Sequence, residues 1–477
     1  MVTRHGKVPF SIKAAYGTSS VADGIKNGVF NSFLLFYYTG VLGLPGSLAG
    51  TALFLAMCFD AISDPLVGYL SDHTHSRLGR RHPYMYAAAI PMGISVYLLL
   101  APPADLGNTG LFAWMTALSI SVRLAITLNM IPRGALVPEI TYDYDERTSL
   151  VAAGYFMGWC GMLGLSQIAW LLIIPSTEGG RMAPEAYRQI GMVAGVASAT
   201  AILASAAGTH RIIPELRKPD AVPVGFRAFL GEIKNAFSNH SFRMIMIGGV
   251  IVSVAGNFQE VFGLYMNTYF WEFEDGDIAR LALLLGVAVL LATFGVRRLS
   301  QLSDKRRTVI GLGMFLFLWA PLTVLGRFAG LMPENSSPWL LWIVVGHLAV
   351  AIVPFIAISI LLSSMFKDIV DEIELDSGRR QEGLIGAAIA FMLKAVAGVG
   401  NLMGGIAIEM IDFPTQAAPG AVPPEKVFWL GMVAGPGLMI VYVLGFVFLS
   451  RYSITRERFT EIRAALDARA RESKPTT

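Results

Sequence analysis

Residues 58–83, CFDAISDPLVGYLSDHTHSRLGRRHP, decide how this chain folds. Two aspartates, Asp60 and Asp64, interrupt a run that is otherwise apolar enough for lipid, and a burst of arginine follows it. A carboxylate at the middle of a membrane span costs several kcal/mol. We therefore expect both carboxylates to face a cavity, where they pair with a charge or bind an ion.

The composition fits a chain that lies mostly in lipid. Of the 477 residues, 54% are hydrophobic and only 15% are charged, and the mean hydropathy is +0.57, whereas soluble domains carry about 25% charged residues. A net charge of +3 is too small to indicate a nucleic-acid partner. Cys58 and Cys160 lie in apolar runs and predict neither a disulfide framework nor a CxxC site. The first residues lack the features of a signal peptide, so we expect the first apolar segment to be retained.

Apolar runs of about 20 residues predict membrane-spanning helices, and the chain has twelve such runs. They fall near residues 14–40, 46–71, 84–102, 110–137, 149–174, 186–208, 243–271, 278–299, 307–328, 338–366, 381–410 and 427–450. The fold class is therefore an all-α integral membrane protein. Lys and Arg crowd alternate loops and both ends of the chain, which predicts that both termini are cytoplasmic.

A long polar stretch near the middle of the chain separates six spans from six. We predict an N-terminal six-helix bundle over 1–208, a cytoplasmic linker over 209–242, a C-terminal six-helix bundle over 243–451 and a cytoplasmic tail helix over 452–477. Two repeated bundles are the organisation of many secondary transporters, which bind their solute between the bundles.

The carboxylates of the second span form an oxygen-rich group. Asp60, Ser63 and Asp64 stand at positions i, i+3 and i+4, so all three side chains project from one face of a helix. Two like charges this close favour binding of a proton or a cation, and hard oxygen ligands suit Na⁺ or Li⁺ rather than Zn²⁺ or copper. The alternative is a static ion pair between one of these aspartates and Lys26 or Arg123.

Other ionisable residues lie near mid-depth of their predicted spans, where they are candidate contacts for a polar solute. They are Asp23, Lys26, Arg123, Glu260 and Lys394. Asp23 and Lys26 are three residues apart, so mutual neutralisation is an equal alternative for that pair. For the other three, a resting network of salt bridges stays open.

The arginine burst predicts a cytoplasmic gate. The guanidinium group of arginine forms paired hydrogen bonds with carboxylates, and it also bonds the carbonyl oxygens at the end of a neighbouring helix. Such bonds would hold the cytoplasmic face of the protein closed. The residues concerned are Asp72, Arg77, Arg80 and Arg81. The alternative is that these arginines only set the topology of the chain.

These residues resemble a known family. DAISDPLVGYLSDHTHSRLGRRHPY, IPRGALVPEITYDYDERTSL, LYMNTYFW and MFKDIVDEIELDSGRRQEGLIGAAIAFMLK are similar, in order and over nearly the whole chain, to segments of the glycoside–pentoside–hexuronide:cation symporters of the major facilitator superfamily. The resemblance implies the major facilitator fold and cation-coupled sugar transport.

The family pattern also implies roles for particular residues. It places the coupling cation on Asp60, Ser63, Asp64 and a helix-4 threonine, which matches Thr127 here. If sodium is the ion, Asp60 and Asp64 are its metal ligands. Lys394 matches a lysine that members keep in helix 11. We extend the predicted cytoplasmic gate to the charged residues of the matching segment after span 10, namely Asp368, Asp371, Arg379 and Arg380.

The family's sugar site is only partly present. Its helix-4 Asp and Trp fall at Met130 and Gly134, and its helix-5 Arg falls at Gly154 or Tyr155. The helix-10 Trp falls at Ser359. The charges of Arg123, Lys394 and Glu260 suit a charged or zwitterionic glycoside, an acid or an amphiphile better than a neutral disaccharide.

Together these observations predict a multi-pass inner (plasma) membrane transporter that works by cation-coupled symport and alternating access. Its solute is by family a glycoside or other carbohydrate, or alternatively an anionic or zwitterionic lysolipid-like amphiphile or organic acid. No HExxH motif, nucleophile elbow or phosphate-binding glycine loop indicates an enzyme. We expect no cofactor other than the coupling ion, Na⁺ or H⁺, and a monomer in the lipid bilayer. A channel and a sensor that binds without flux are the rivals.

Overall fold

The described chain is entirely helical. The structure is a computed structural model, and it describes residues 7–141, 143–215, 237–299, 304–377, 396 and 398–472, which contain no strand. Among these residues, eight helices are long and apolar enough to cross a membrane. They are Gly46–His73, Asn108–Ile140, Asp145–Ser176, Pro184–His210, His240–Phe270, Lys305–Phe328, Pro338–Leu375 and Pro424–Leu449. The prediction of an all-α membrane protein is therefore confirmed.

Two compact units make up the chain, and each is described by itself. Unit 1 is Met1–Ala221, Glu260–Leu283 and Ala397–Leu430, and unit 2 is Val222–Gln259, Leu284–Val396 and Gly431–Thr477. Two segments from the second half of the sequence thus group with the first half. Residues 216–236 of the predicted linker lie outside the described residues.

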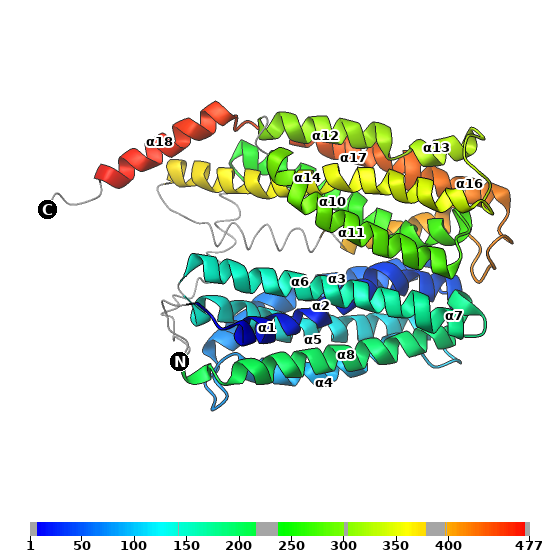
Figure 1. Ribbon diagram of the computed structural model, residues 1–477, viewed down its shortest axis with the longest axis horizontal. Helices are drawn as coiled ribbons and strands as arrows, with labels where there is room; N and C mark the ends of the chain where they lie inside the picture. The colour runs from blue at the N-terminus through cyan, green and yellow to red at the C-terminus, as the bar shows by residue number, and fades with distance from the viewer. Residues whose placement is uncertain are drawn as a thin grey trace. The chain divides into compact units, whose positions relative to one another are not determined.

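Unit 1 contains the six predicted N-terminal spans. Its helices are α1 (Phe10–Thr18), α2 (Ser20–Gly28), α3 (Gly46–His73), α4 (His82–Leu99), α5 (Asn108–Ile140), α6 (Tyr144–Ile168), α7 (Ile174–Ser176) and α8 (Pro184–His210). The helix α4 packs on α5 and α8, α3 packs on α5, and α1 and α2 pack on α6 and α8. Figure 1 shows these long helices side by side, with α7 at the end of the bundle opposite the N-terminus.

The predicted first span is not a single regular helix. After α1 and α2, the chain continues through two π-helical stretches, Val29–Leu34 and Tyr37–Val41. Similar π-helical stretches, Ala169–Ile173 and Met266–Phe270, extend α6 and the helix α10 (His240–Tyr265). Such wide turns are frequent at functional sites.

Glycine allows some helices of unit 1 to approach at backbone distance. A Cβ atom added at Gly24 of α2 would lie 1.9 Å from the carbonyl oxygen of Gly158 on α6. A Cβ added at Gly195 of α8 would lie 2.5 Å from the carbonyl oxygen of Gly93 on α4. Lipid supplies no hydrophobic force between helices, so close packing through small residues holds such a bundle together.

Unit 2 contains the remaining described helices. They are the first part of α10, most of α11 (Asp275–Leu299), α12 (Lys305–Trp319), α13 (Leu322–Phe328), α14 (Pro338–Ser377), the end of α16 (Pro424–Met432) from Gly431 on, α17 (Leu438–Leu449) and α18 (Arg456–Glu472). A buried cluster that includes Phe242, Met365, Ile369, Leu449 and Tyr452 forms its core. The side chain of Ile462 on α18 is also part of this core, so the predicted tail helix is packed there rather than free.

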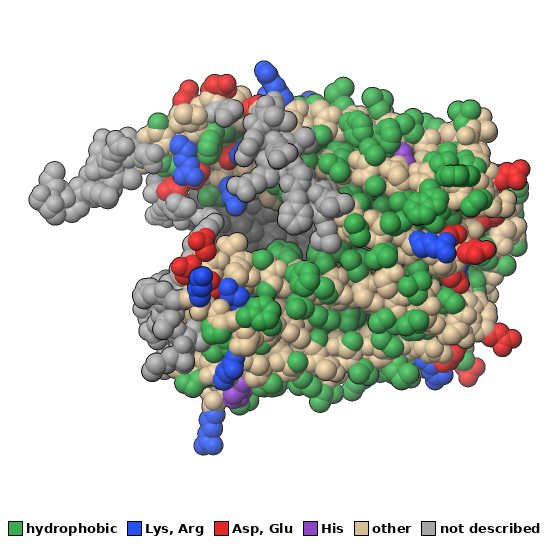
Figure 2. Space-filling view, in the orientation of Figure 1, with side chains coloured by type: hydrophobic (Ala, Val, Ile, Leu, Met, Phe, Trp, Pro, Cys, Tyr) green, Lys and Arg blue, Asp and Glu red, His purple; other side chains and the backbone are tan. Residues whose placement is uncertain are grey.

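The outer surface of unit 1 is suited to lipid. In Figure 2, hydrophobic side chains cover the middle of this unit, and Lys, Arg, Asp and Glu side chains gather toward its ends. Ile90 on α4, Leu172 in the stretch after α6 and Val196 on α8 are each 64% exposed. Large apolar side chains exposed to this extent are unfavourable in water and favourable in a bilayer.

Candidate functional site: a carboxylate pair between α3 and α5

The helix α3 presents the predicted oxygen ligands on one face. Asp60 and Ser63 are buried, at 5% and 4% exposed, and Asp64 is half-buried. The hydroxyl of Ser63 donates to the backbone carbonyl of Asp60 at 3.2 Å. Because its proton points along its own helix, the oxygen of Ser63 keeps lone pairs for a cation.

Thr127 on α5 completes the group. Its hydroxyl lies 3.0 Å from Oδ1 of Asp60 and 2.9 Å from Oδ1 of Asp64, and Thr127 is 2% exposed. The structure thus brings together the four residues that the resemblance implies. We call Asp60, Ser63, Asp64 and Thr127 the oxygen nest.

A proline adds a further acceptor beside the oxygen nest. Pro65 lies inside α3, directly after Asp64. Proline has no N–H, so the carbonyl of Ala61 lacks its usual helical donor. Carboxylate, hydroxyl and carbonyl oxygens together are the ligands that hard cations prefer. Within the described residues, no cluster of three or more His, Cys, Asp or Glu side chains could hold a metal ion.

Arg123 pairs with one carboxylate of the oxygen nest. It lies one turn before Thr127 on α5, is 6% exposed, and its Nη1 is 3.4 Å from Oδ2 of Asp60. Its guanidinium also lies over the ring of Phe30, 5.1 Å from the ring centroid. An ion pair at 3.4 Å is looser than the 2.7–2.9 Å that is typical of charge-assisted bonds, by about half an ångström. The ion pair that the sequence left as an alternative is therefore present, but in an extended geometry.

Two more predicted solute contacts pair with each other. Nζ of Lys26 is 3.1 Å from Oδ1 of Asp23, and both side chains are partly exposed. Glu260 of α10 belongs to unit 1 and lines a small pocket with Phe30, Asn31 and Asn401. Phe30 therefore has Arg123 against its ring and also borders the pocket of Glu260. Lys394 lies outside the described residues.

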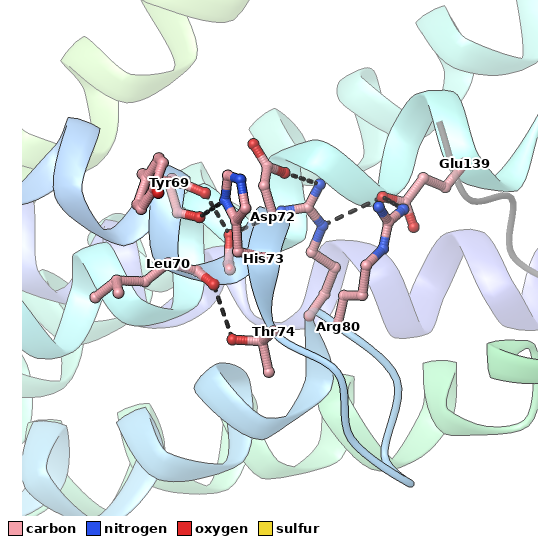
Figure 3. Close-up of polar contacts among 10 residues, drawn as sticks. Tyr69, Leu70, Asp72, His73, Thr74, Arg80 and Glu139 are labelled. Atoms are coloured by element: carbon pink, nitrogen blue, oxygen red, sulfur yellow. Dashed lines mark hydrogen bonds and ion pairs between the residues drawn. The ribbon is translucent and has the colours of Figure 1, made fainter. Parts of the chain in front are cut away.

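The arginine burst binds a carboxylate that the sequence analysis did not identify. Nε of Arg81 and Nη2 of Arg80 lie 3.2 and 3.0 Å from Oε1 of Glu139, at the end of α5. Arg81 also reaches Oδ1 of Asp72 at 2.5 Å and the hydroxyl of Ser71 at 2.7 Å. Figure 3 shows Asp72 and Glu139 on opposite sides of one guanidinium group, with Arg80 beside Glu139. Glu139 stands in the quoted segment IPRGALVPEITYD, but 58 residues separate it from Arg81, so no local pattern indicated the contact.

The other predicted gate residues are placed separately. Arg77 is exposed. In unit 2, Asp368 pairs with Lys305 at 2.6 Å, and Asp371 pairs with Arg463 of α18 at 3.3 Å. Arg379 and Arg380 lie outside the described residues.

A known family model matches most of the sequence. The model described as MFS/sugar transport protein matches residues 15–456. The chain belongs to this family. The resemblance to the glycoside–pentoside–hexuronide:cation symporters is thereby confirmed, and with it the major facilitator fold.

Individual relatives of this MFS/sugar transport chain cover nearly its whole length. It is 25% identical to the isoprimeverose transporter of Lactiplantibacillus pentosus, over 88% of this chain and 84% of the relative. It is 24% identical to a protein proposed to import sulfoquinovose in Escherichia coli strain K12, over 97% and 95% of the two chains. An inward-open structure of the xylose transporter XylE from E. coli is similar in fold, with a TM-score of 0.59, 14% identity and coverage of 95% and 99%.

Family membership decides the class of activity. The protein is a multi-pass inner-membrane transporter and not an enzyme. Cation-coupled sugar symport by alternating access is the function that the family supports, so a small-molecule solute and a coupling cation are its partners.

Proposed function

We propose that the oxygen nest binds the coupling ion, Na⁺ or H⁺, and that the bound ion allows a sugar-derived solute to be carried inward. The observation that carries this proposal is the position of Thr127, whose hydroxyl lies within 3.0 Å of both carboxylates. Two carboxylates that share one hydroxyl form an oxygen-rich group, which would favour binding of a cation or a proton.

Arg123 has a defined part in this proposal. In the absence of a cation, its guanidinium supplies positive charge to Asp60 at 3.4 Å. When a cation enters the nest, the attraction that holds Arg123 weakens and the guanidinium becomes available to the solute. Binding of the ion and binding of the solute would then be coupled through one side chain.

The remaining features complete the proposal. The chain would have twelve membrane-spanning helices in two bundles, with both termini cytoplasmic, and would act as a monomer without a cofactor. Asp23, Lys26, Arg123, Glu260 and Lys394 would contact the solute. Moving one positive charge inward releases about 2.3 kcal/mol per 100 mV, which is enough to concentrate a solute about fiftyfold.

Two relatives indicate the range of solutes. Isoprimeverose is a neutral disaccharide, whereas sulfoquinovose is a sugar that carries a sulfonate. We propose that this chain also takes a sugar-derived solute, and that a negative charge on it is favoured by the cationic side chain of Arg123. Lysolipid-like amphiphiles are the alternative solute class.

Uptake by sealed proteoliposomes tests the coupling. Under an imposed Na⁺ or H⁺ gradient, the wild-type protein should concentrate a solute from a panel of glycosides, uronides and lysolipids. Asp60→Asn or Asp64→Asn should abolish this accumulation while the protein stays folded. Asp105→Asn, which changes an exposed loop acid, is the control and should leave accumulation unchanged. Wild-type accumulation by either nest variant would refute the coupling role, and flux without accumulation would indicate a channel.

A further inference from the structure

One basic side chain of α1, α2 and α5 has no acidic partner among the residues that the structure describes. The helices α1, α2 and α5 carry four basic residues, and three of them pair with carboxylates. These pairs are Lys13 with Glu146 at 2.8 Å, Lys26 with Asp23 at 3.1 Å and Arg123 with Asp60 at 3.4 Å. The fourth, Arg133 of α5, forms no ion pair within the part of the chain that the structure describes. An uncompensated charge inside a span is expensive and normally marks a binding site or a pathway.

The contacts of Arg133 leave one edge of its guanidinium free. Nη1 is 3.4 Å from the carbonyl oxygen of Tyr16 and also donates to the hydroxyl of Ser20. The guanidinium lies over the ring of Tyr16, 5.0 Å from its centroid. Nε is buried and has no hydrogen-bond partner among the described residues. The edge formed by Nε and Nη2 is the fork that binds a carboxylate or a sulfonate through two parallel bonds.

Two glycines lie near Arg133. Gly134, the next residue of α5, is exposed, and a Cβ atom added there would meet no atom within 4 Å outside its chain neighbours and its own helix backbone. A Cβ added at Gly154 on α6 would lie 3.7 Å from Nη1 of Arg133. Met130, one turn before Arg133, is 38% exposed. Gly154 therefore places no side chain against the Arg133 guanidinium from α6, and Gly134 is an exposed position beside Arg133 on α5.

The charge at this place differs from the family pattern given above. The position of the helix-4 acid holds Met130, and the position of the helix-5 arginine holds Gly154 or Tyr155. Arg133 reaches from α5 to Gly154, so a guanidinium is still present near that position. Compared with the family pattern, this part of the chain has one negative charge fewer and keeps one positive charge. That difference favours a solute that itself carries an anionic group.

We propose that Arg133 is a specificity-determining residue that binds the anionic group, a carboxylate or a sulfonate, of a charged sugar. The proposal deepens the function above and rests on it, because it names the chemical class of the solute for the same transporter. The competing explanation is structural: Arg133 ties α5 to α1 and α2 through Tyr16 and Ser20, and binds nothing else.

Three probes that differ only at C6 separate these explanations. They are methyl β-D-glucoside, methyl β-D-glucuronide and the corresponding 6-deoxy-6-sulfo glucoside, and their binding to the purified full-length protein would be measured by titration calorimetry. The wild-type protein should bind at least one charged probe about tenfold more tightly than the neutral probe, because hydrogen bonds between charged partners are stronger than hydrogen bonds between neutral ones. A preference for one of the two charged probes identifies the anion.

Two variants of Arg133 and one control are compared. Arg133→Gln should remove the preference for the charged probes and leave affinity for the neutral probe within about twofold. Arg133→Lys should keep part of the preference, since it retains the charge without the fork. Ser20→Ala removes a structural hydrogen bond of Arg133 but not its free edge, so the preference should persist. The melting temperature of each variant shows that it is folded.

Several results would overturn the assignment. They are equal affinity of the wild-type protein for neutral and charged probes, no binding of any probe, or an unchanged preference in Arg133→Gln. If Ser20→Ala loses the preference as fully as Arg133→Gln, the structural explanation is correct. Repeating the titrations in sodium chloride and in choline chloride over a pH series separates the two proposals. A charge preference without any dependence on Na⁺ or pH would contradict the proposed coupling but leave the role of Arg133 intact.

Discussion

The single hydroxyl of Thr127 cannot donate to both carboxylates of the oxygen nest at once. A hydroxyl has one proton, so Thr127 can donate to Asp60 or to Asp64 at a given moment, but not to both. The structure places both carboxylates within 3.0 Å of that hydroxyl. When the proton serves one carboxylate, the threonine oxygen faces the other as a second acceptor. A cation at this point would turn three mutually repelling oxygens into ligands.

Removing this hydroxyl should lower the affinity for the coupling ion more than it lowers the stability of the fold. In Thr127→Val the shape is kept and the oxygen is lost, so we expect the Na⁺ or H⁺ concentration for half-maximal uptake to rise about tenfold, the effect of losing one polar contact. Thr127→Ser keeps the oxygen and serves as the control. The measurement is initial uptake by proteoliposomes as a function of ion concentration. An unchanged half-saturation value in Thr127→Val would contradict the role of Thr127 as a ligand.

The sequence could predict the local half of this site but not the distant half. Asp60, Ser63 and Asp64 follow from helical periodicity alone, because their spacing places them on one face. Thr127 was reached only through the family resemblance, since 67 residues separate it from Asp60. Glu139 and Arg133 were missed for the same reason: their partners Arg81 and Ser20 are 58 and 113 residues away. A pairing between spans depends on how the helices pack, which no local pattern encodes.

At the scale of helices, the contact between α2 and α6 is set by glycine. Besides Gly24, a Cβ added at Gly161 of α6 would lie 2.4 Å from the carbonyl oxygen of Val21. Both obstructing atoms belong to the backbone and cannot rotate away. The sequence predicted both spans, yet it did not indicate which of their many glycines lie at the contact.

A single methyl group at this contact should therefore disrupt the bundle. Gly24→Ala places its Cβ 1.9 Å from the carbonyl oxygen of Gly158, and relieving the clash requires α2 and α6 to move apart. Overpacking costs about 1–3 kcal/mol or more, so we expect a lower melting temperature and a lower yield of monodisperse protein. Gly164→Ala on α6 is the matched control, because nothing lies within 4 Å of its added Cβ. Equal melting temperatures for the two variants would contradict this account of the packing.

The positions of the spans were predicted more reliably than the type of helix, α or π, within each span. The predicted runs at 46–71 and 186–208 correspond to α3 (Gly46–His73) and α8 (Pro184–His210). The first run corresponds to α1, α2 and two π-helical stretches, which hydropathy cannot reveal because an apolar run has the same composition in either geometry. Most of the eleventh run, 381–410, lies outside the described residues.

At the scale of the whole chain, one arginine joins segments from the two halves of the sequence within unit 1. Arg181 lies in a short turn between α7 and α8. Its Nε is 2.6 Å from Oδ1 of Asp275, and its Nη2 donates to the carbonyl oxygen of Phe273 at 2.5 Å. Arg181 is only 9% exposed, and the hydroxyl of Tyr187 donates to its carbonyl oxygen at 2.9 Å. These bonds lie at the end of the bundle that the predicted topology places outside the cell, and we predict that they hold this end closed.

Removing Arg181 should make this outer end open more often. In a background of Cys58→Ala and Cys160→Ala, a cysteine introduced as Ala279→Cys would report opening, because Ala279 is 1% exposed. Adding Arg181→Gln should raise the rate at which a membrane-impermeant maleimide labels that cysteine in intact cells by about tenfold, which corresponds to about 1.4 kcal/mol. The ion pair is mostly buried, so its loss should have at least this effect. Arg188→Gln removes an exposed arginine that also pairs with an acid, and it should leave the labelling rate unchanged. If both arginine variants label at the same rate, Arg181 does not hold the outer end closed.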